Sequence, residues 1–256
     1  MVNSIISIYL FYNNMQASIP TYILYSERET ERAVSIKVFK KTFTQLTIVP
    51  SVYPKYTHVP YLEKLIQKSK ERTGAALKPS EIGCLLGHRK IWQDIVRKAS
   101  NDQEHYLVME SDSKILDMPI LSSEFKKYTQ PFDLFFWGAW DGHISIKRSS
   151  ILYHENGHKV GTPLIKSVYC TYGYSINKKA AQYLLAQTRK ISYPVDMFKH
   201  FVAPGSIKIG GIQKEIISTW SNMGSYIRSN TIGSSIKRFL ILLVFTTRNA
   251  IQAFFS

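Results

Sequence analysis

Two acidic residues one position apart follow an apolar segment and could hold a metal ion. Residues 105–109 (HYLVM) are typical of a short buried strand, and Glu110-Ser111-Asp112 comes directly after them. Ligands of open α/β sheets bind at the carboxyl ends of the strands. Mg²⁺ and Mn²⁺ bind carboxylates together with phosphate oxygens, so Glu110 and Asp112 are candidate ligands of a cation that bridges a diphosphate. The alternative is that both acids are solvated loop residues.

Two arginines and a histidine are further candidates. Arg28 and Arg32 follow the apolar residues 20–25, and the planar guanidinium group suits bidentate binding of phosphate. The alternative for such a run of charges is a solvated helix face. His88 lies four positions before Trp92, so the two side chains share one face of a helix. His88 is therefore either a site residue or a packed residue of the core.

Strands and helices alternate in the part of the chain that would position these residues. Residues 20–25 (PTYILY) predict a buried strand, residues 26–43 a helix after a short loop, and residues 46–52 a second strand. This order indicates a parallel α/β unit. Pro79 and Ser80 open a long helix, with Ser80 as its expected N-cap and one apolar stripe along its length.

The second half of the chain continues in the same way. Residues 133–137 (DLFFW) predict a strand, and residues 166–176 are strand-like. Asn177 is the expected N-cap of the next helix. Ser192-Tyr193-Pro194 predicts the start of a further helix, which would carry Asp196.

Composition limits the classes of partner. The chain has 256 residues, 45% of them hydrophobic, and a net charge of +15, so it can bury a core and is attracted to polyanions. Nucleic acid, an anionic membrane and a phosphorylated substrate all fit that charge. Its two cysteines, Cys84 and Cys170, fit a reducing compartment, and no Cys/His spacing suggests zinc. Residues 1–16 lack a basic start and a cleavage site, so we expect no signal peptide there.

The end of the chain differs from the rest. Residues 239–245 (FLILLVF) form an apolar run that is too short to span a bilayer. On a helical wheel the polar residues Lys237, Arg248, Asn249 and Gln252 fall on one side. An amphipathic helix in the plane of a membrane fits this pattern, and so does a helix that packs on the domain or on another subunit.

Several of these motifs, in order, resemble glycosyltransferase family 25, which includes the lipooligosaccharide galactosyltransferases of Gram-negative bacteria. The family pattern has a Glu-Ile-Gly-Cys helix start, a Ser-His, a Trp and an apolar strand ending in Glu-Asp-Asp. The matching residues here are Glu81-Ile82-Gly83-Cys84, Gly87-His88, Trp92 and Glu110-Ser111-Asp112. Other parts of the pattern resemble residues 23–32, Tyr172 to Ala181, Pro194-Val195-Asp196 and Ser225-Tyr226-Ile227. The chain departs from the pattern at Leu24-Tyr25, at Gly87 and at Ser111, which replaces the middle acid.

The resemblance implies a GT-A fold, which is a Rossmann-like mixed α/β sheet with helices on both faces. That domain would cover residues 1–228, with its core starting at about residue 18, and residues 229–256 would form a basic and apolar amphipathic tail. It also implies inverting transfer of galactose from UDP-galactose, with Mn²⁺ or Mg²⁺ as cofactor, onto a lipopolysaccharide or lipooligosaccharide acceptor. The protein would then be cytoplasmic and peripheral to the bacterial inner membrane.

The resemblance also suggests roles for individual residues. Arg28, Arg32, His88, Glu110 and Ser111 would bind the donor, and Glu110 and Asp112 would bind the metal. A general base must reach the acceptor hydroxyl. Asp196 is the first candidate for this base, although it could instead cap its helix. Asp141 is the second, because it follows an aromatic loop, Trp137-Gly138-Ala139-Trp140, that could stack on a sugar.

Two other functions are compatible with parts of the sequence. Ser111 in place of an acid would also suit a catalytically impaired relative that binds a glycan or a partner enzyme. The basic composition would suit a nucleic-acid-binding protein, but Lys and Arg are dispersed and no recognition motif is present. We therefore expect no nucleic-acid partner.

Overall fold

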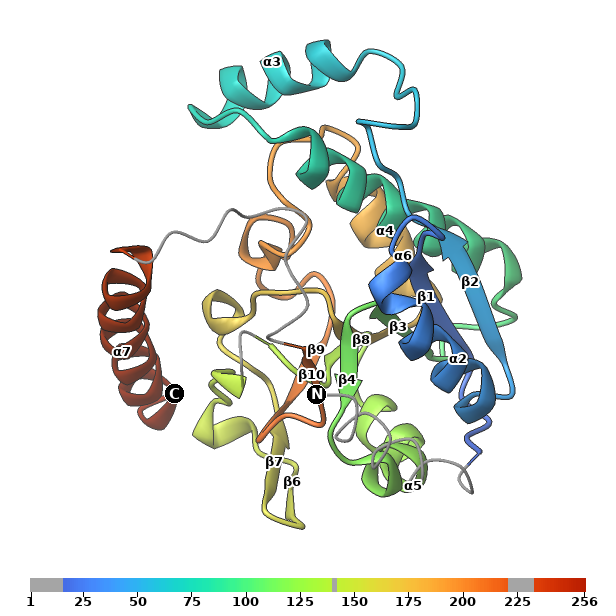
Figure 1. Ribbon diagram of the computed structural model, residues 1–256. Helices are drawn as coiled ribbons and strands as arrows, with labels where there is room; N and C mark the ends of the chain where they lie inside the picture. Colours follow the sequence, from blue (N-terminus) through green and yellow to red (C-terminus); the bar gives the residue numbers. More distant parts are fainter. Residues whose placement is uncertain (1–15, 140–141, 221–232) are drawn as a thin grey trace.

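The computed structural model describes residues 16–139, 142–220 and 233–256 (Figure 1). In the last of these segments, side chains are described only from Val244 onward. Within the described residues, eight strands form one mixed sheet in the order β2-β1-β3-β8-β5-β9-β7-β6. The strands are β1 (Thr21–Tyr25), β2 (Leu46–Pro50), β3 (Tyr106–Glu110), β5 (Leu134–Phe136), β6 (Tyr153–Glu155), β7 (His158–Gly161), β8 (Gly173–Ile176) and β9 (Ile209–Gln213). A small second sheet pairs β4 (Ser113–Ile115) with β10 (Ile217–Thr219).

The predicted parallel α/β unit is confirmed. β1 pairs in parallel with β2 on one side and with β3 on the other. The connection from β1 to β2 contains the 3-10 helix η1 (Thr30–Arg32) and α2 (Ala33–Thr42). Because the three strands run in one direction, their carboxyl ends meet at one edge of the sheet. Glu110 ends β3 at this edge, and the connection that carries Arg28 and Arg32 leaves β1 at the same edge.

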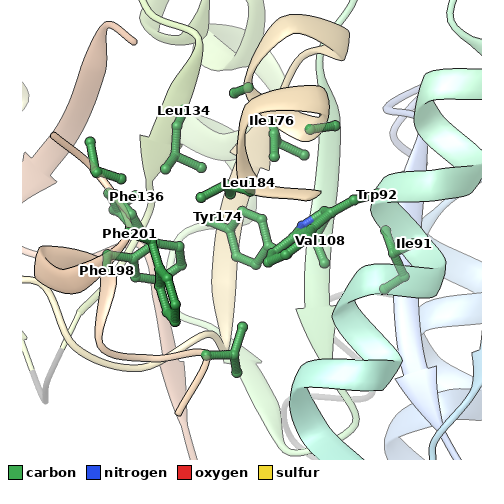
Figure 2. Packing of buried hydrophobic residues seen from close by; sticks show 14 of the residues in the cluster. Ile91, Trp92, Val108, Leu134, Phe136, Tyr174, Ile176, Leu184, Phe198 and Phe201 are labelled. Carbon is green, nitrogen blue, oxygen red and sulfur yellow. The ribbon is translucent and has the colours of Figure 1, made fainter. Parts of the chain in front are cut away.

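Side chains alternate between two hydrophobic cores along each strand. In β3, Tyr106 and Val108 belong to one core, whereas Leu107 and Met109 belong to the other. α4 (Pro79–Lys98) and α6 (Lys178–Gln187) contact each other and cover the first core. α2 and α5 (Met118–Thr129) cover the second. Figure 2 shows the first core, where Trp92 of α4 lies against Tyr174 of β8. The mixed α/β class, with helices on both faces of the sheet, is as predicted.

Three local expectations need correction. Lys78 rather than Ser80 is the N-cap of α4, because Pro79 takes the first helical position and Glu81 accepts a hydrogen bond from the Lys78 N–H at 2.8 Å. Of residues 166–176, only the β8 residues form a strand. The segment before β8 contains a 3-10 helix and a positive φ of 79° at Cys170. The expected N-cap Asn177 is confirmed by its bond from the Ala180 N–H.

The helix expected to carry Asp196 is absent from the described residues. Asp196 lies in a turn, in which the Met197 N–H donates to the Pro194 carbonyl. Only the three-residue 3-10 helix η5 (Phe198–His200) follows. The buried side chains of Val195 and Phe198 anchor this segment to the first core, so the chain follows the core surface instead of continuing a helix. Asp196 therefore caps no α-helix.

The remaining helices lie at the periphery. α3 (Leu62–Thr73) precedes α4, and the short helices η3 (Arg148–Ser150) and η4 (Ile165–Ser167) lie in the loops before and after β6 and β7. α7 (Gly233–Phe254), red in Figure 1, comes after β10 in the chain. Among the described residues, no helix combines the length and apolarity that crossing a membrane would require.

The described part of α7 turns polar residues toward the domain. Asn249 is 1% exposed, and Gln252 accepts a hydrogen bond from Lys166. Arg148 lies 4.5 Å from the centre of the Phe254 ring. Several apolar side chains of α7 and the residues after it are exposed: Val244, Ile251, Phe254 and Phe255. The helix thus packs on the domain through part of the polar side that the helical wheel predicts.

Candidate functional site

A cleft of about 1100 Å³ opens at the carboxyl ends of β1 and β3. The loop after β1, the loop after β2 and the first turns of α4 form its walls. Glu110, Ser111 and Asp112 lie at its floor, because Glu110 ends the buried strand β3 and the other two residues follow it directly. Gly83 lets α4 approach the loop after β2, since a Cβ there would collide with the Val52 carbonyl oxygen. The cleft is thus built where the sequence places its candidate residues.

Arg32 holds three acceptor side chains together at the floor of the cleft. Its Nη1 donates to the Ser111 Oγ at 2.9 Å and to the Glu29 carboxylate at 3.2 Å. Its Nη2 donates to the Asp112 Oδ2 at 2.9 Å. Ser111 in turn donates its hydroxyl proton to Glu29. These contacts fix the buried Arg32 against the partly buried Asp112, whereas a guanidinium group on a solvated helix face would remain mobile.

Glu29 brings a carboxylate beside the residue that replaces the middle acid. Its side chain is 2% exposed and also accepts a hydrogen bond from the Tyr53 hydroxyl at 2.5 Å. Glu29 was not among the residues predicted from the sequence, because it lies in a run of charges whose ordinary interpretation is a solvated surface. The feature that could have predicted Glu29 as a site residue is its position shortly after β1, at the same sheet edge as Glu110.

Glu110 contacts a second group of residues behind the floor. It accepts a hydrogen bond from Thr171, and its Oε1 lies 3.5 Å from the His88 Nε2. His88 is fully buried, and its Nδ1 lies 2.9 Å from the Tyr174 hydroxyl. The same hydroxyl accepts the indole N–H of Trp92 at 2.9 Å. The expected shared face of His88 and Trp92 is therefore real, and Tyr174 joins the two side chains.

The two acids of the floor have different proton affinities. Burial, followed by the negative charge of Glu110, raises the pKa of Asp112 to about 6, and the ion pair with Arg32 opposes this shift without cancelling it. Burial also acts to raise the pKa of Glu110, but His88, Thr171 and Arg32 together lower it. Two carboxylates close together in a buried place disfavour a second negative charge. A cation between them would relieve that repulsion.

A divalent cation fits the donor atoms at this floor. The Asp112 Oδ1 is buried and has no hydrogen-bond partner among the described residues. Glu110 and Asp112 both line the cleft, and hard carboxylate oxygens suit Mg²⁺ or Mn²⁺. The wall of the cleft adds basic side chains that are exposed, namely Arg28, Lys55 and Lys78. The arrangement can therefore hold a cation at an acidic floor and an anion at a basic rim.

The other candidate residues lie at different distances from this floor. Arg28 lines the cleft, with its guanidinium carbon 4.6 Å from the centre of the Tyr56 ring. Asp196 is close enough to Cys84, which lines the cleft, that its charge adds to burial and to Glu110 in raising the pKa of that thiol. Asp141 and the neighbouring Trp140 lie outside the described residues, as do Ser225-Tyr226-Ile227.

Comparison with known proteins identifies one family. The family model described as "Glycosyltransferase family 25 (LPS biosynthesis protein)" matches residues 19–199, which is more than half of the chain. Among proteins with curated descriptions, none matches the chain significantly. The matched range contains the cleft floor, the rim and Asp196.

Proposed function

The chain belongs to glycosyltransferase family 25, whose members act in lipopolysaccharide biosynthesis, and from that premise we propose that it transfers galactose from UDP-galactose to a lipooligosaccharide or lipopolysaccharide acceptor, with inversion at the anomeric carbon. The observation that carries the proposal is the cleft at the end of β3. There a buried oxygen of Asp112 without a hydrogen-bond partner among the described residues lies below a basic rim. A nucleoside diphosphate carries the complementary charge.

The acids of the floor and the arginines would share the work of binding the donor. Glu110 and Asp112 would hold the divalent cation, which when bound neutralises charge on the departing diphosphate. Arg28 has its guanidinium at the exposed rim, where it can donate to a phosphate. Arg32 is engaged with Glu29, Ser111 and Asp112, so its role would be to position Asp112.

The acceptor hydroxyl must lose a proton as it attacks the sugar. We propose Asp196 as the base that accepts it. Asp196 lies in a turn and is within electrostatic range of Cys84 in the cleft wall. Asp141 is the alternative base. Asp196→Asn should lower kcat more than it weakens UDP binding, because the base acts on the acceptor and not on the donor. A variant that lost UDP affinity and kept kcat would exclude this role.

The function is tested by incorporation of labelled galactose. Purified protein, UDP-[¹⁴C]galactose, Mn²⁺ and a truncated lipooligosaccharide should give a labelled glycolipid, and chelation should abolish the label. Asp112→Asn should lose at least about a hundredfold in rate, whereas Glu63→Gln, which changes an exposed acid on α3, serves as the matched control. No label and no donor hydrolysis with any nucleotide sugar would refute the proposal. UDP binding without transfer would instead favour a catalytically impaired relative.

We also propose that the protein works at the cytoplasmic surface of an anionic membrane. Two observations support this: the net charge of +15 and the exposed apolar side chains at the end of α7. The protein should float with vesicles that contain acidic phospholipid and should not float with neutral vesicles. Ile251→Asp with Phe255→Asp should weaken binding, and Leu152→Asp, at an exposed apolar residue elsewhere, is the control. Equal binding by all variants would contradict the role of α7.

A further inference from the structure

The cysteine and histidine of α4 meet the glutamate at the end of β3. Cys84 and His88 lie one helical turn apart on the same helix, and Glu110 reaches them from the neighbouring strand. The ligand atoms of the three side chains all lie within 4.8 Å of one another. No Cys/His spacing in the sequence suggests zinc, because the third ligand comes from another element and carries no local signal.

The spacing of two of these atoms already matches a metal site. The His88 Nε2 and the Glu110 Oε1 are 3.5 Å apart. In a tetrahedral zinc site, metal–ligand bonds of about 2.0–2.3 Å place neighbouring ligand atoms roughly 3.3–3.7 Å apart. To reach this spacing from a separation of up to 4.8 Å, the thiol needs to approach by roughly 1.1–1.5 Å at most, which one side-chain rotation can supply.

The buried histidine is held in a suitable orientation. His88 is fully buried, and its Nε2 has no hydrogen-bond partner among the described residues. Its Nδ1 is fixed by the Tyr174 hydroxyl, which is itself fixed by Trp92. Metal-binding histidines are commonly oriented by such a contact at the other ring nitrogen. When the Nδ1 carries the proton, the Nε2 lone pair points toward Glu110 and is available to a metal ion.

We infer that Cys84, His88 and Glu110 form a site for a thiophilic divalent cation of the zinc class, separate from the Asp112 oxygen but sharing Glu110. Sulfur and imidazole ligands favour Zn²⁺ or Co²⁺, whereas Mg²⁺ and Mn²⁺ favour oxygen. The thiol proton leaves to solvent as the metal binds. Cys84 lines the cleft, so the fourth position of the metal is open to it. An ion bound here would occupy Glu110, which would then be lost as a ligand of the cation that binds the donor diphosphate, and transfer would be inhibited. Only this expected inhibition rests on the proposed function.

The site is tested by metal binding without any activity measurement. Metal-free protein is titrated with Zn²⁺ by calorimetry and with Co²⁺ by absorption spectroscopy. We expect one ion per chain and a near-ultraviolet thiolate-to-cobalt band. Cys84→Ser should abolish the band, and His88→Gln should weaken Zn²⁺ binding at least tenfold, while circular dichroism verifies that both variants fold. Cys170→Ser should bind Zn²⁺ like the unchanged protein, because it alters the other cysteine.

Asp112→Asn separates this inference from the proposed function. That variant should lose galactose transfer and keep Zn²⁺ binding, because Asp112 is outside the three-residue set. Zn²⁺ should inhibit transfer by the unchanged protein and inhibit the Cys84→Ser variant at least tenfold less, relative to each protein's own rate. Absence of stoichiometric Zn²⁺ binding, or equal Zn²⁺ affinity in the Cys84→Ser variant, would overturn the inference even if transfer is confirmed.

Discussion

Replacing Ser111 by aspartate would place a carboxylate against one that is already buried. Ser111 is 2% exposed, and its hydroxyl donates to the Glu29 carboxylate. Arg32 donates to both residues, at 2.9 Å to Ser111 and at 3.2 Å to Glu29. The substitution Ser111→Asp would restore the acid of the family pattern in the sequence. In the structure, however, it would replace a hydrogen-bond donor by a like charge.

The magnitude follows from these contacts. Two carboxylates about 4 Å apart repel each other by roughly 4 kcal/mol at an effective dielectric constant of 20. Loss of the serine donor leaves part of Glu29 less well solvated, which costs about 1–3 kcal/mol. Arg32 attracts the new carboxylate and recovers part of both costs. We therefore expect Ser111→Asp to lower the free energy of unfolding by roughly 2–4 kcal/mol.

Urea unfolding at pH 7 measures this change, and two further variants isolate its cause. In Ser111→Asn, the new side chain has nearly the shape of aspartate but no charge, so this variant should lose less stability than Ser111→Asp. The double variant Glu29→Ser with Ser111→Asp exchanges the two groups and should recover at least half of the loss. The position of Glu29 beside Ser111 would be contradicted by either of two results. The first is a free energy of unfolding of Ser111→Asp within about 0.5 kcal/mol of the unchanged protein, and the second is a double variant that recovers none of the lost stability.

Three further predictions concern buried polar contacts of the fold and the shape of the cleft. Burial opposes a low pKa for Asp133, but the bond from the Lys208 N–H and two side-chain donors lower the pKa nonetheless. The stability that Asp133 provides should therefore be complete above about pH 4 and be lost as the pH falls through the lowered pKa. In urea unfolding, Asp133→Asn should lower the free energy of unfolding by about 1–3 kcal/mol at pH 7 and by less at pH 3. Tyr174→Phe removes a hydroxyl that serves two buried side chains; it should cost about 1–3 kcal/mol in the same assay, and no loss would contradict that contact. Gly83→Ala should displace the loop that holds Val52 and weaken UDP binding in calorimetry at least fivefold, whereas unchanged affinity would show that the loop does not shape the cleft.

The fold class was predictable because it depends on local patterns. The apolar segments that became β1, β2 and β3 are short, and α4 has a continuous apolar stripe. Period-two alternation is hidden in β3, since both faces of the central sheet are buried and its first four residues, Tyr106 to Met109, are all hydrophobic. Strands toward the other edge of the sheet, such as β6 and β9, were not predicted, because β6 is short and β9 contains two glycines.

The site was predictable mainly where its residues lie at the end of a strand or shortly after it, and His88 of α4 was predicted through its spacing from Trp92. Glu110 and Asp112 have that position, and Arg32 comes one short loop after β1. Thr171 and Tyr53 had no such signal, although both hydrogen-bond to acids of the floor. Asp196 was found through its motif, while its local structure was predicted wrongly, because burial of the apolar neighbours on either side outweighed the helix pattern. The roles of these residues remain predictions.

Charge is arranged in space rather than along the chain. The floor contains three carboxylates, of Glu29, Glu110 and Asp112, against the single guanidinium of Arg32. The excess of negative charge is unfavourable in a buried place and would also repel a diphosphate. A divalent cation would reverse both effects, since it would neutralise the floor and leave the rim free to attract phosphate. From the sequence alone, Ser111 marks a lost acid. In the structure, the loop after β1 places the carboxylate of Glu29 beside Ser111, so a residue of another segment supplies the local negative charge that a bound cation would neutralise.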